Sequence, residues 1–300
     1  FNATIPAFEA DNVNLPVPIV VAADNKTDAT GNAIDKIHKK GKVAVTKELT
    51  VMVYNIGTQK YSEIKEWRKM VMNLAEGNTS DNINLVIETS RMSDTEPQGR
   101  YLHTPNSSHL SKISELNGAI TDYRELIDFG VWAKKMFPAK RYILFIHGHG
   151  STWWNGTNKP MVPANVDKGI GYYGDDTGNY LSTVELGTAL RKMGGVDVLG
   201  LLSCGEQTIE VVYEVSDSVK VVVGSEEVSD TDDYRYRLFM EQISSNPSIT
   251  NEEIGKLLVL QYRHEVRPTC LSAIRTENLP TLMNHIRLFT ELAISEDPAL

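Results

Sequence analysis

Five short segments rich in aliphatic and β-branched residues are the feature that most limits what this chain can fold into. They lie at residues 49–56, 83–89, 141–147, 196–202 and 219–225. Strands this apolar must be buried on both faces, which is typical of a mostly parallel sheet with helices on both sides. We therefore expect an α/β fold in which a mostly parallel sheet is sandwiched by helices.

The segments between and around these strands divide the chain into three expected parts. Residues 1–44 are polar and poorly periodic, and we expect an N-terminal extension or peripheral segment there. Residues 45–236 alternate between strand and helix patterns and form the expected α/β core. Residues 237–300 are mainly helical in pattern, so we expect a helical C-terminal part packed on the core.

Helix periodicity and capping signals place the expected helices. The pattern predicts a helix near 61–76 and a helical region around 111–137. Ser182 with Glu185, and Thr250 with Glu253, have the spacing of capping boxes, in which each side chain satisfies a free amide of the other residue. Helices are therefore expected to begin at these two places, the second continuing through 254–264.

Composition excludes several classes of protein. A formal net charge of −9 argues against nonspecific binding to nucleic acid or acidic membranes and fits a cationic peptide partner. The apolar runs are strand-length, well short of the roughly 20 residues of a membrane-spanning helix. Two cysteines provide neither a disulfide framework nor a CxxC metal motif. The first residue is Phe1 rather than Met, from which we expect a matured or trimmed chain.

Two of the predicted strands end on reactive side chains. His149 lies just past the strand at 141–147, between Gly148 and Gly150, and Cys204 lies just past the strand at 196–202. Chemistry in open parallel sheets occurs outside the carboxyl ends of the strands, so these side chains should face one crevice if the strands are neighbours. A stretch with helical character, 206–215, follows Cys204, and a helix start would favour its thiolate. The residues thus predict a cysteine–histidine dyad.

Each of these residues also has an inert interpretation. A single cysteine in an apolar environment is usually a buried, unreactive side chain. His147 continues the alternation of its strand and is the better candidate for a packed core or supporting role, and with His149 it lacks the further ligands of a zinc site. Ser203 would suggest a serine hydrolase, but its turn lacks the first glycine of the Gly-x-Ser-x-Gly elbow.

Several segments taken together resemble the clostripain family of cysteine peptidases, in the larger group that includes caspases, legumains and gingipains. The matching segments, in order, are 49–56, 137–142, 149–153, 169–176, 181–186, 199–204, 210–214 and 223–227. The run His149-Gly150-Ser151-Thr152-Trp153 is similar to the family's His-Gly-Ser-Gly-Trp block. The resemblance implies a caspase-haemoglobinase-like fold and cysteine endopeptidase activity. Together with the non-Met start, it also implies an exported protein, in the periplasm, on the cell surface or secreted.

The resemblance also implies roles for single residues. His149 would be the general acid–base and Cys204 the nucleophile, with the backbone amides of Gly150 and Cys204 as oxyanion donors. Ser203 and Glu226, near the ends of matching strands, would be substrate-binding residues. Peptides or proteins would be the substrates, and a monomer is the default expectation.

The chain departs from the family at a position that bears on specificity. Many members carry Asp-Ala-Cys at the nucleophile, where the Asp helps to form a pocket for Arg or Lys, and here the aligned residue is Leu202. Asp232 aligns with a second acidic pocket residue and is the remaining candidate for binding a cationic side chain, the alternative being a solvated acidic loop.

Other properties of some relatives give further expectations. Self-cleavage in the loop between the His and Cys blocks would occur after Lys159 or Lys168. No cofactor is expected to be required and no metal ligand is assigned, although Asp175-Asp176 and Asp230 to Asp233 form acidic clusters that lack a full calcium-loop motif. The alternative function is a catalytically silent or latent relative that binds peptides or proteins.

Overall fold

The computed structural model describes residues 46–57, 61–90, 98–116, 119–152, 170–171, 180–230, 232, 234–263 and 270–296. The strands are β1 Lys47–Asn55, β2 Ile83–Thr89, β3 Gly99–His103, β4 Leu110–Glu115, β5 Ala139–His147, β6 Val196–Leu202, β7 Val219–Ser225 and β8 Leu271–Arg275. The α-helices are α1 Tyr61–Gly77, α2 Tyr123–Met136, α3 Thr183–Lys192, α4 Ile209–Val215, α5 Tyr236–Ser245, α6 Asn251–Leu260 and α7 Leu279–Glu296.

One mixed sheet organises the described residues, in the strand order β4-β3-β2-β1-β5-β6-β7-β8. The five central strands are β2, β1, β5, β6 and β7, and neighbours among them pair in parallel. The outer pairs, β4 with β3, β3 with β2 and β7 with β8, are antiparallel. The expected mostly parallel sheet is therefore confirmed, and β5 and β6 are neighbours at its centre.

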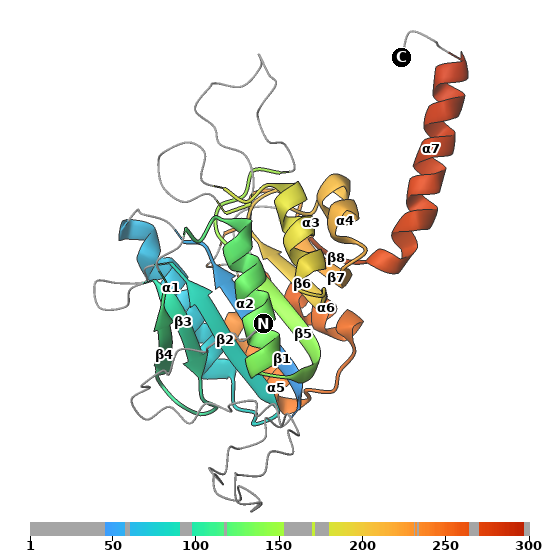
Figure 1. Ribbon diagram of the computed structural model, residues 1–300. Helices are drawn as coiled ribbons and strands as arrows, with labels where there is room; N and C mark the ends of the chain where they lie inside the picture. Colours follow the sequence, from blue (N-terminus) through green and yellow to red (C-terminus); the bar gives the residue numbers. More distant parts are fainter. Residues whose placement is uncertain are drawn as a thin grey trace, which may run out of the picture.

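Helices cover both faces of this sheet, as the apolar strands predicted (Figure 1). On one face, α1, α5 and α6 pack against side chains such as Val51, Phe145 and Val198. On the other face, α2, α3 and α4 pack against Met52, Leu144 and Leu199. Successive residues of each central strand enter opposite cores, which is why these strands carry apolar residues at consecutive positions.

Both predicted capping boxes are confirmed. Ser182 accepts a hydrogen bond from the amide of Glu185, whose carboxylate accepts one from the amide of Ser182, at the start of α3. Thr250 and Glu253 make the same exchange at the start of α6. The second helix ends at Leu260, before the expected 264.

One local prediction was wrong at the two sides of the sheet, and two strands were not predicted there. Residues 110–115 form strand β4, not the first part of a helix, because they pair with β3. Strand β3 lies in a stretch for which no strand was predicted. Strand β8 interrupts the predicted helical C-terminal part and pairs with β7. Residues 1–44 lie outside the described part of the chain.

An ion-pair network centred on the buried Arg100 joins strands β2 and β3 to helix α2. Arg100 donates from Nε to Glu88 at 2.6 Å and from a terminal nitrogen to Asp128 at 2.7 Å. Its guanidinium carbon lies 4.9 Å from the centre of the Trp132 ring, a cation–π contact. Glu88 is fully buried, and burial raises its pKa to about 8 against the opposing effect of Arg100, so the network offsets only part of the cost of a charge inside the core.

Helix α7 differs from the other helices in its surroundings. It projects away from the body of the molecule (Figure 1), and Leu279 at its first position is its buried residue. Its exposed apolar side chains include Phe289, at 72% exposure, and Leu292, at 61%. Among the described residues, no helix is both long enough and apolar enough to cross a membrane.

Candidate active site

The carboxyl ends of β5 and β6 bring the two predicted catalytic segments together. His147, the last residue of β5, is in register with Leu202, the last residue of β6, and with Asn55, the last residue of β1. The chain segments that follow β5 and β6 therefore leave the sheet at the same end. Parallel α/β sheets place their ligands at this end, outside the carboxyl ends of the strands.

The loop after β5 and the turn after β6 are in direct contact. A β-carbon added to Gly150 would lie 2.4 Å from the carbonyl oxygen of Cys204 and 2.9 Å from Cβ of Ser203. A β-carbon added to Gly205 would lie 2.8 Å from Cγ2 of Thr152. Gly150 is thus required by the close approach of two backbone segments, whereas Gly205 is required by the Thr152 side chain and by its own φ of +70°.

His147 is a core residue, as its place in the strand predicted. It is 1% exposed, and its Nδ1 lies 2.8 Å from Oδ1 of Asn55. The Thr89 hydroxyl donates to the carbonyl of Ser90 and accepts from Nδ2 of Asn55, which leaves Oδ1 of Asn55 to accept from His147. Burial lowers the pKa of His147 to about 3, helped by the nearby His149. The imidazole is therefore neutral, with its Nδ1 hydrogen committed to Asn55.

His149 occupies a different environment two residues later. It is half-buried, and its ring centre lies 5.5 Å from that of Trp67 on α1, at an interplanar angle of 67°. Trp67 also contacts His147, with ring centres 5.2 Å apart. The His149 carbonyl accepts a hydrogen bond from the amide of Gly171 at 2.5 Å. The indole ring of Trp67 therefore packs against the imidazole of His149.

Cys204 is half-buried, and its sulfur engages the loop after β7. Sγ lies 3.4 Å from the carbonyl oxygen of Ser229, to which it donates, and 3.4 Å from the amide nitrogen of Ser229, from which it accepts. The prediction that Cys204 immediately precedes a helix was wrong, because α4 begins at Ile209. In the segment between Cys204 and α4, the amide of Gln207 donates a hydrogen bond to the carbonyl of Ser225, which ties this segment to the end of β7 before the helix begins.

Glu206 joins the cysteine turn to the histidine loop. Its Oε1 accepts hydrogen bonds from the amides of Ser151, at 3.1 Å, and Thr152, at 3.2 Å. The side chain is 0% exposed, and burial raises its pKa to about 7, against the opposing effect of these two hydrogen bonds. A carboxylate is thus held between the two segments that carry the candidate dyad.

The predicted substrate-binding residues lie at the same end of the sheet with different exposure. Ser203 is buried, at 3% exposure, and Glu226 is exposed just after β7. Asp232 is exposed, and its Oδ1 accepts from Nζ of Lys69 on α1 at 2.8 Å. Leu202 packs into the core formed with α1, α5 and α6.

Several predictions fall on residues outside the described part of the chain. They are the self-cleavage candidates Lys159 and Lys168, and Asp175, Asp176 and Asp233 of the acidic clusters. Within the described ranges, no group of three His, Cys, Asp or Glu side chains is arranged to hold a metal ion. Cys204 and Cys270 both carry free thiols.

Three residues of this site were not among the sequence candidates: Asn55, Trp67 and Glu206. A signal was present for Asn55, since it is a polar residue ending an apolar strand at the same sheet edge. Glu206 follows Cys204 closely but was assigned to an amphipathic stretch. Trp67 has the spacing of a core residue on α1, and only the packing of α1 on the sheet brings it to the histidines.

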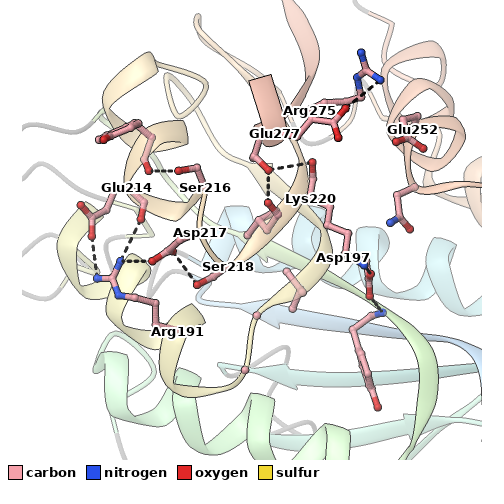
Figure 2. A pocket seen from close by; sticks show the side chains of 18 of the residues that line it. Arg191, Asp197, Glu214, Ser216, Asp217, Ser218, Lys220, Glu252, Arg275 and Glu277 are labelled. Carbon is pink, nitrogen blue, oxygen red and sulfur yellow. Dashed lines mark hydrogen bonds and ion pairs between the residues drawn. The ribbon is translucent and has the colours of Figure 1, made fainter. Parts of the chain in front are cut away.

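A second pocket lies at the opposite end of the strands, next to the amino ends of β6 and β7 (Figure 2). Its volume is about 1110 Å³. Its arginine and lysine side chains are already engaged: Arg191 pairs with Glu214 and Asp217, Lys220 with Asp197, Arg275 with Glu277, and Lys134 with carbonyls of the turn after α3. This pocket is separate from the candidate dyad.

Comparison with solved structures shows the same architecture in bacterial proteases. A secreted C11 cysteine protease from Bacteroides thetaiotaomicron, solved in complex with an irreversible peptide inhibitor, matches with a TM-score of 0.61 and 17% identity, over 79% of this chain and 68% of that one. An inactive zymogen C11 protease from Parabacteroides distasonis matches with a TM-score of 0.62 and 16% identity, over 80% of this chain and 65% of that one. The chain thus spans about two thirds of the length of these structures.

Comparison of sequences gives the family. No curated protein sequence matches the chain. The model of the clostripain family, peptidase family C11, matches residues 69–298, which is more than half of the chain and includes both His149 and Cys204. As the sequence motifs predicted, the chain therefore belongs to the clostripain family and is a cysteine-type peptidase.

Proposed function

We propose that this peptidase cleaves internal peptide bonds with Cys204 as nucleophile and His149 as general acid–base. The observation that carries the proposal is the contact between the two segments, in which the backbone of Gly150 lies against the carbonyl of Cys204. His147 is unsuited to the role, because it is buried and its Nδ1 hydrogen is bonded to Asn55.

The chemistry follows from these assignments. The Cys204 thiolate attacks the carbonyl carbon of the scissile bond, and the negative charge that develops on oxygen is stabilised by the amides of Gly150 and Cys204. His149 protonates the departing amine, which leaves an acyl-enzyme. It then takes a proton from water, which attacks the thioester and releases the acid product and the thiol.

The contacts of the Cys204 thiol support a latent form as the second candidate. Sγ exchanges hydrogen bonds with both backbone groups of Ser229, and the thiol must leave them to attack a substrate. A peptidyl electrophile distinguishes the two states, because a competent enzyme is labelled at Cys204 as isolated. A silent peptide-binding relative would bind the same peptide without covalent labelling.

For specificity, we propose that Asp232 pairs with Arg or Lys at P1, the substrate residue before the cleaved bond. In the free protein Lys69 occupies this carboxylate, at 2.8 Å. Both side chains are about half exposed, so the pair is worth at most about 1 kcal/mol and a bidentate guanidinium can displace it. Asp232→Asn should remove the preference for basic P1 residues, whereas Lys69→Gln should lower KM for them.

The first test is hydrolysis of a fluorogenic peptide library varied at P1, with the wild type and Cys204→Ala assayed side by side. Cleavage after Arg or Lys that is lost in Cys204→Ala supports both proposals. Cleavage after other residues, also lost in Cys204→Ala, keeps the dyad and refutes the basic pocket. Absence of Cys204-dependent turnover and of labelling refutes the catalytic proposal in favour of the silent relative.

Three further properties are proposed from the family. Export to the periplasm, cell surface or medium is supported by the description of a Bacteroides relative as secreted. Self-cleavage after Lys159 or Lys168 would give two fragments on incubation, and an active enzyme that stays intact would refute it. Peptidase activity should persist in a chelator, and calcium-dependent activity would refute the expectation that no cofactor is required.

A further inference from the structure

Glu206 carries a buried carboxyl group that takes no part in the proposed steps of peptide hydrolysis by His149 and Cys204. It lies two residues after Cys204, has 0% exposure, and bonds with Oε1 to the amides of Ser151 and Thr152, two and three residues after His149. Its other oxygen, Oε2, is buried and has no hydrogen-bond partner among the described residues. Burying an ionisable group without a cation is costly, so packing alone does not explain its presence.

The two amides that Glu206 binds belong to a backbone in an unfavourable conformation. Thr152 has a φ of +74°, in the left-handed region that a β-branched residue rarely adopts. Such residues persist where surrounding contacts impose them, and they cluster at functional sites. Here the contacts are the Glu206 carboxylate on the amide of Thr152 and Gly205 packed against its methyl group.

We propose that Glu206 is a positioning residue, which holds the His149 loop in register with the Cys204 turn. It acts through backbone atoms: by binding two successive amides it fixes the path of residues 148–152, and with it the places of the His149 ring and the Gly150 amide relative to Cys204. The proposal rests on the proposed dyad and adds to it a residue that needs no contact with substrate.

The chemistry of the interaction makes one substitution conservative and another disruptive. Glu206→Gln keeps a carbonyl oxygen for the two amides and resembles the protonated carboxyl, which burial favours. Glu206→Met keeps the length of the side chain and removes the acceptor. The amides of Ser151 and Thr152 would then be left without this partner.

Gln207 provides a matched control for the loss of buried hydrogen bonds. It is 2% exposed, and its Nε2 donates to the carbonyls of Val222 and Ser272, so it ties the same turn to β7 and β8 instead of to the His149 loop. Gln207→Met therefore removes two hydrogen bonds from the adjacent residue and leaves the loop contact intact. A purely structural role of Glu206 would make the two methionine variants alike.

The experiment compares the wild type, Glu206→Gln, Glu206→Met and Gln207→Met by peptide hydrolysis and by hydrogen exchange of the peptide covering 148–152. We expect Glu206→Met to lose about 100-fold in kcat with KM nearly unchanged, the cost of misplacing reacting groups by about 1 Å. Its 148–152 amides should exchange faster. Glu206→Gln should keep most of the wild-type kcat and the slow hydrogen exchange of residues 148–152. Gln207→Met should resemble the wild type in both kcat and exchange.

The outcomes separate this inference from the proposed function. Equal losses of kcat in Glu206→Met and Gln207→Met, or faster exchange without loss of kcat, would overturn the positioning role. Failure of Glu206→Gln to restore activity would overturn the argument that the amide contacts matter. If the wild type shows no Cys204-dependent turnover, the proposed function fails, and unchanged exchange in Glu206→Met would then separately refute the claim that Glu206 holds the loop.

Discussion

Replacing Gly150 by alanine tests the contact on which the proposed active site depends. Gly150 does not have a positive φ, so the substitution adds volume without backbone strain. The added β-carbon would lie 2.4 Å from the carbonyl oxygen of Cys204, where ordinary contact begins at 3.4 Å. The two segments must therefore separate by 1.0 Å (3.4 − 2.4), because a backbone carbonyl cannot rotate away like a side chain.

A displacement of this size has a calculable effect on catalysis. A misplacement of about 1 Å costs about 100-fold in rate, which corresponds to about 2.7 kcal/mol of transition-state stabilisation. Overpacking at a buried contact costs about 1–3 kcal/mol of stability, which corresponds to a fall in Tm of several degrees in a chain of this size. Gly150→Ala should therefore remain folded and lose most of its kcat/KM.

The assay is Cys204-dependent hydrolysis of the best library peptide, together with thermal unfolding. Gly187→Ala on α3 is the matched control: its β-carbon would meet Oε1 of Glu214 at 2.5 Å and Cγ at 2.8 Å, both in a flexible side chain that can change rotamer, unlike a backbone carbonyl. The control should keep full activity. Wild-type kcat/KM and Tm in Gly150→Ala would refute the described approach of the two segments.

Three further predictions concern stability and titration. Burial raises the pKa of Glu206 to about 7 from 4.5, so its protonated form stabilises the fold below pH 4.5 and this contribution is lost as the pH rises through 7. Relative to Glu206→Gln, the wild type should lose about 3 kcal/mol between pH 4.5 and 8 in urea unfolding, and parallel curves would contradict this. Burial lowers the pKa of His147 to about 3, so its neutral form stabilises the fold above pH 6.5 and this stability is lost as the pH falls toward 3. Its NMR ring signals should not titrate between pH 5 and 8, and a midpoint near 6.5 would place the ring in solvent. Glu88→Ala should cost about 3 kcal/mol or more, since Arg100 loses its buried partner, whereas Glu241→Ala, in an exposed pair with Arg237, should cost less than about 1 kcal/mol, and equal costs would refute the network.

The sequence was most informative where strands are buried on both faces. Strands β2, β6 and β7 have the predicted limits because short, predominantly apolar segments of this kind are buried in a parallel sheet covered on both faces. Strand β4 was assigned to the helical region around 111–137, and only its pairing with β3 reveals a strand. Edge strands depend on partners distant in sequence, which local periodicity does not report.

In the candidate active site too, local pattern predicted some residues, whereas others depend on packing between distant segments. His149 and Cys204 could be predicted because strand ends in a parallel sheet share an edge, a rule that needs only strand limits and strand order. The contacts of Trp67 and Glu206 depend on how α1 packs and on how the turn after β6 is held, and neither follows from spacing. The turn also explains why Cys204 lies away from the start of α4, since Gln207 pairs with the neighbouring strand before the helix begins.

Helix α7 implies that the chain does not unfold as one unit. Since its buried anchor is Leu279, its melting removes little apolar surface from the cores on the two faces of the sheet. An 18-residue helix without packing is marginal in water, and its ion pair between Arg287 and Glu291 adds only a few tenths of a kcal/mol. Residues 280–296 should therefore fray at a free energy far below that of global unfolding. Their amides would exchange in a regime of local opening while the central strands remain protected.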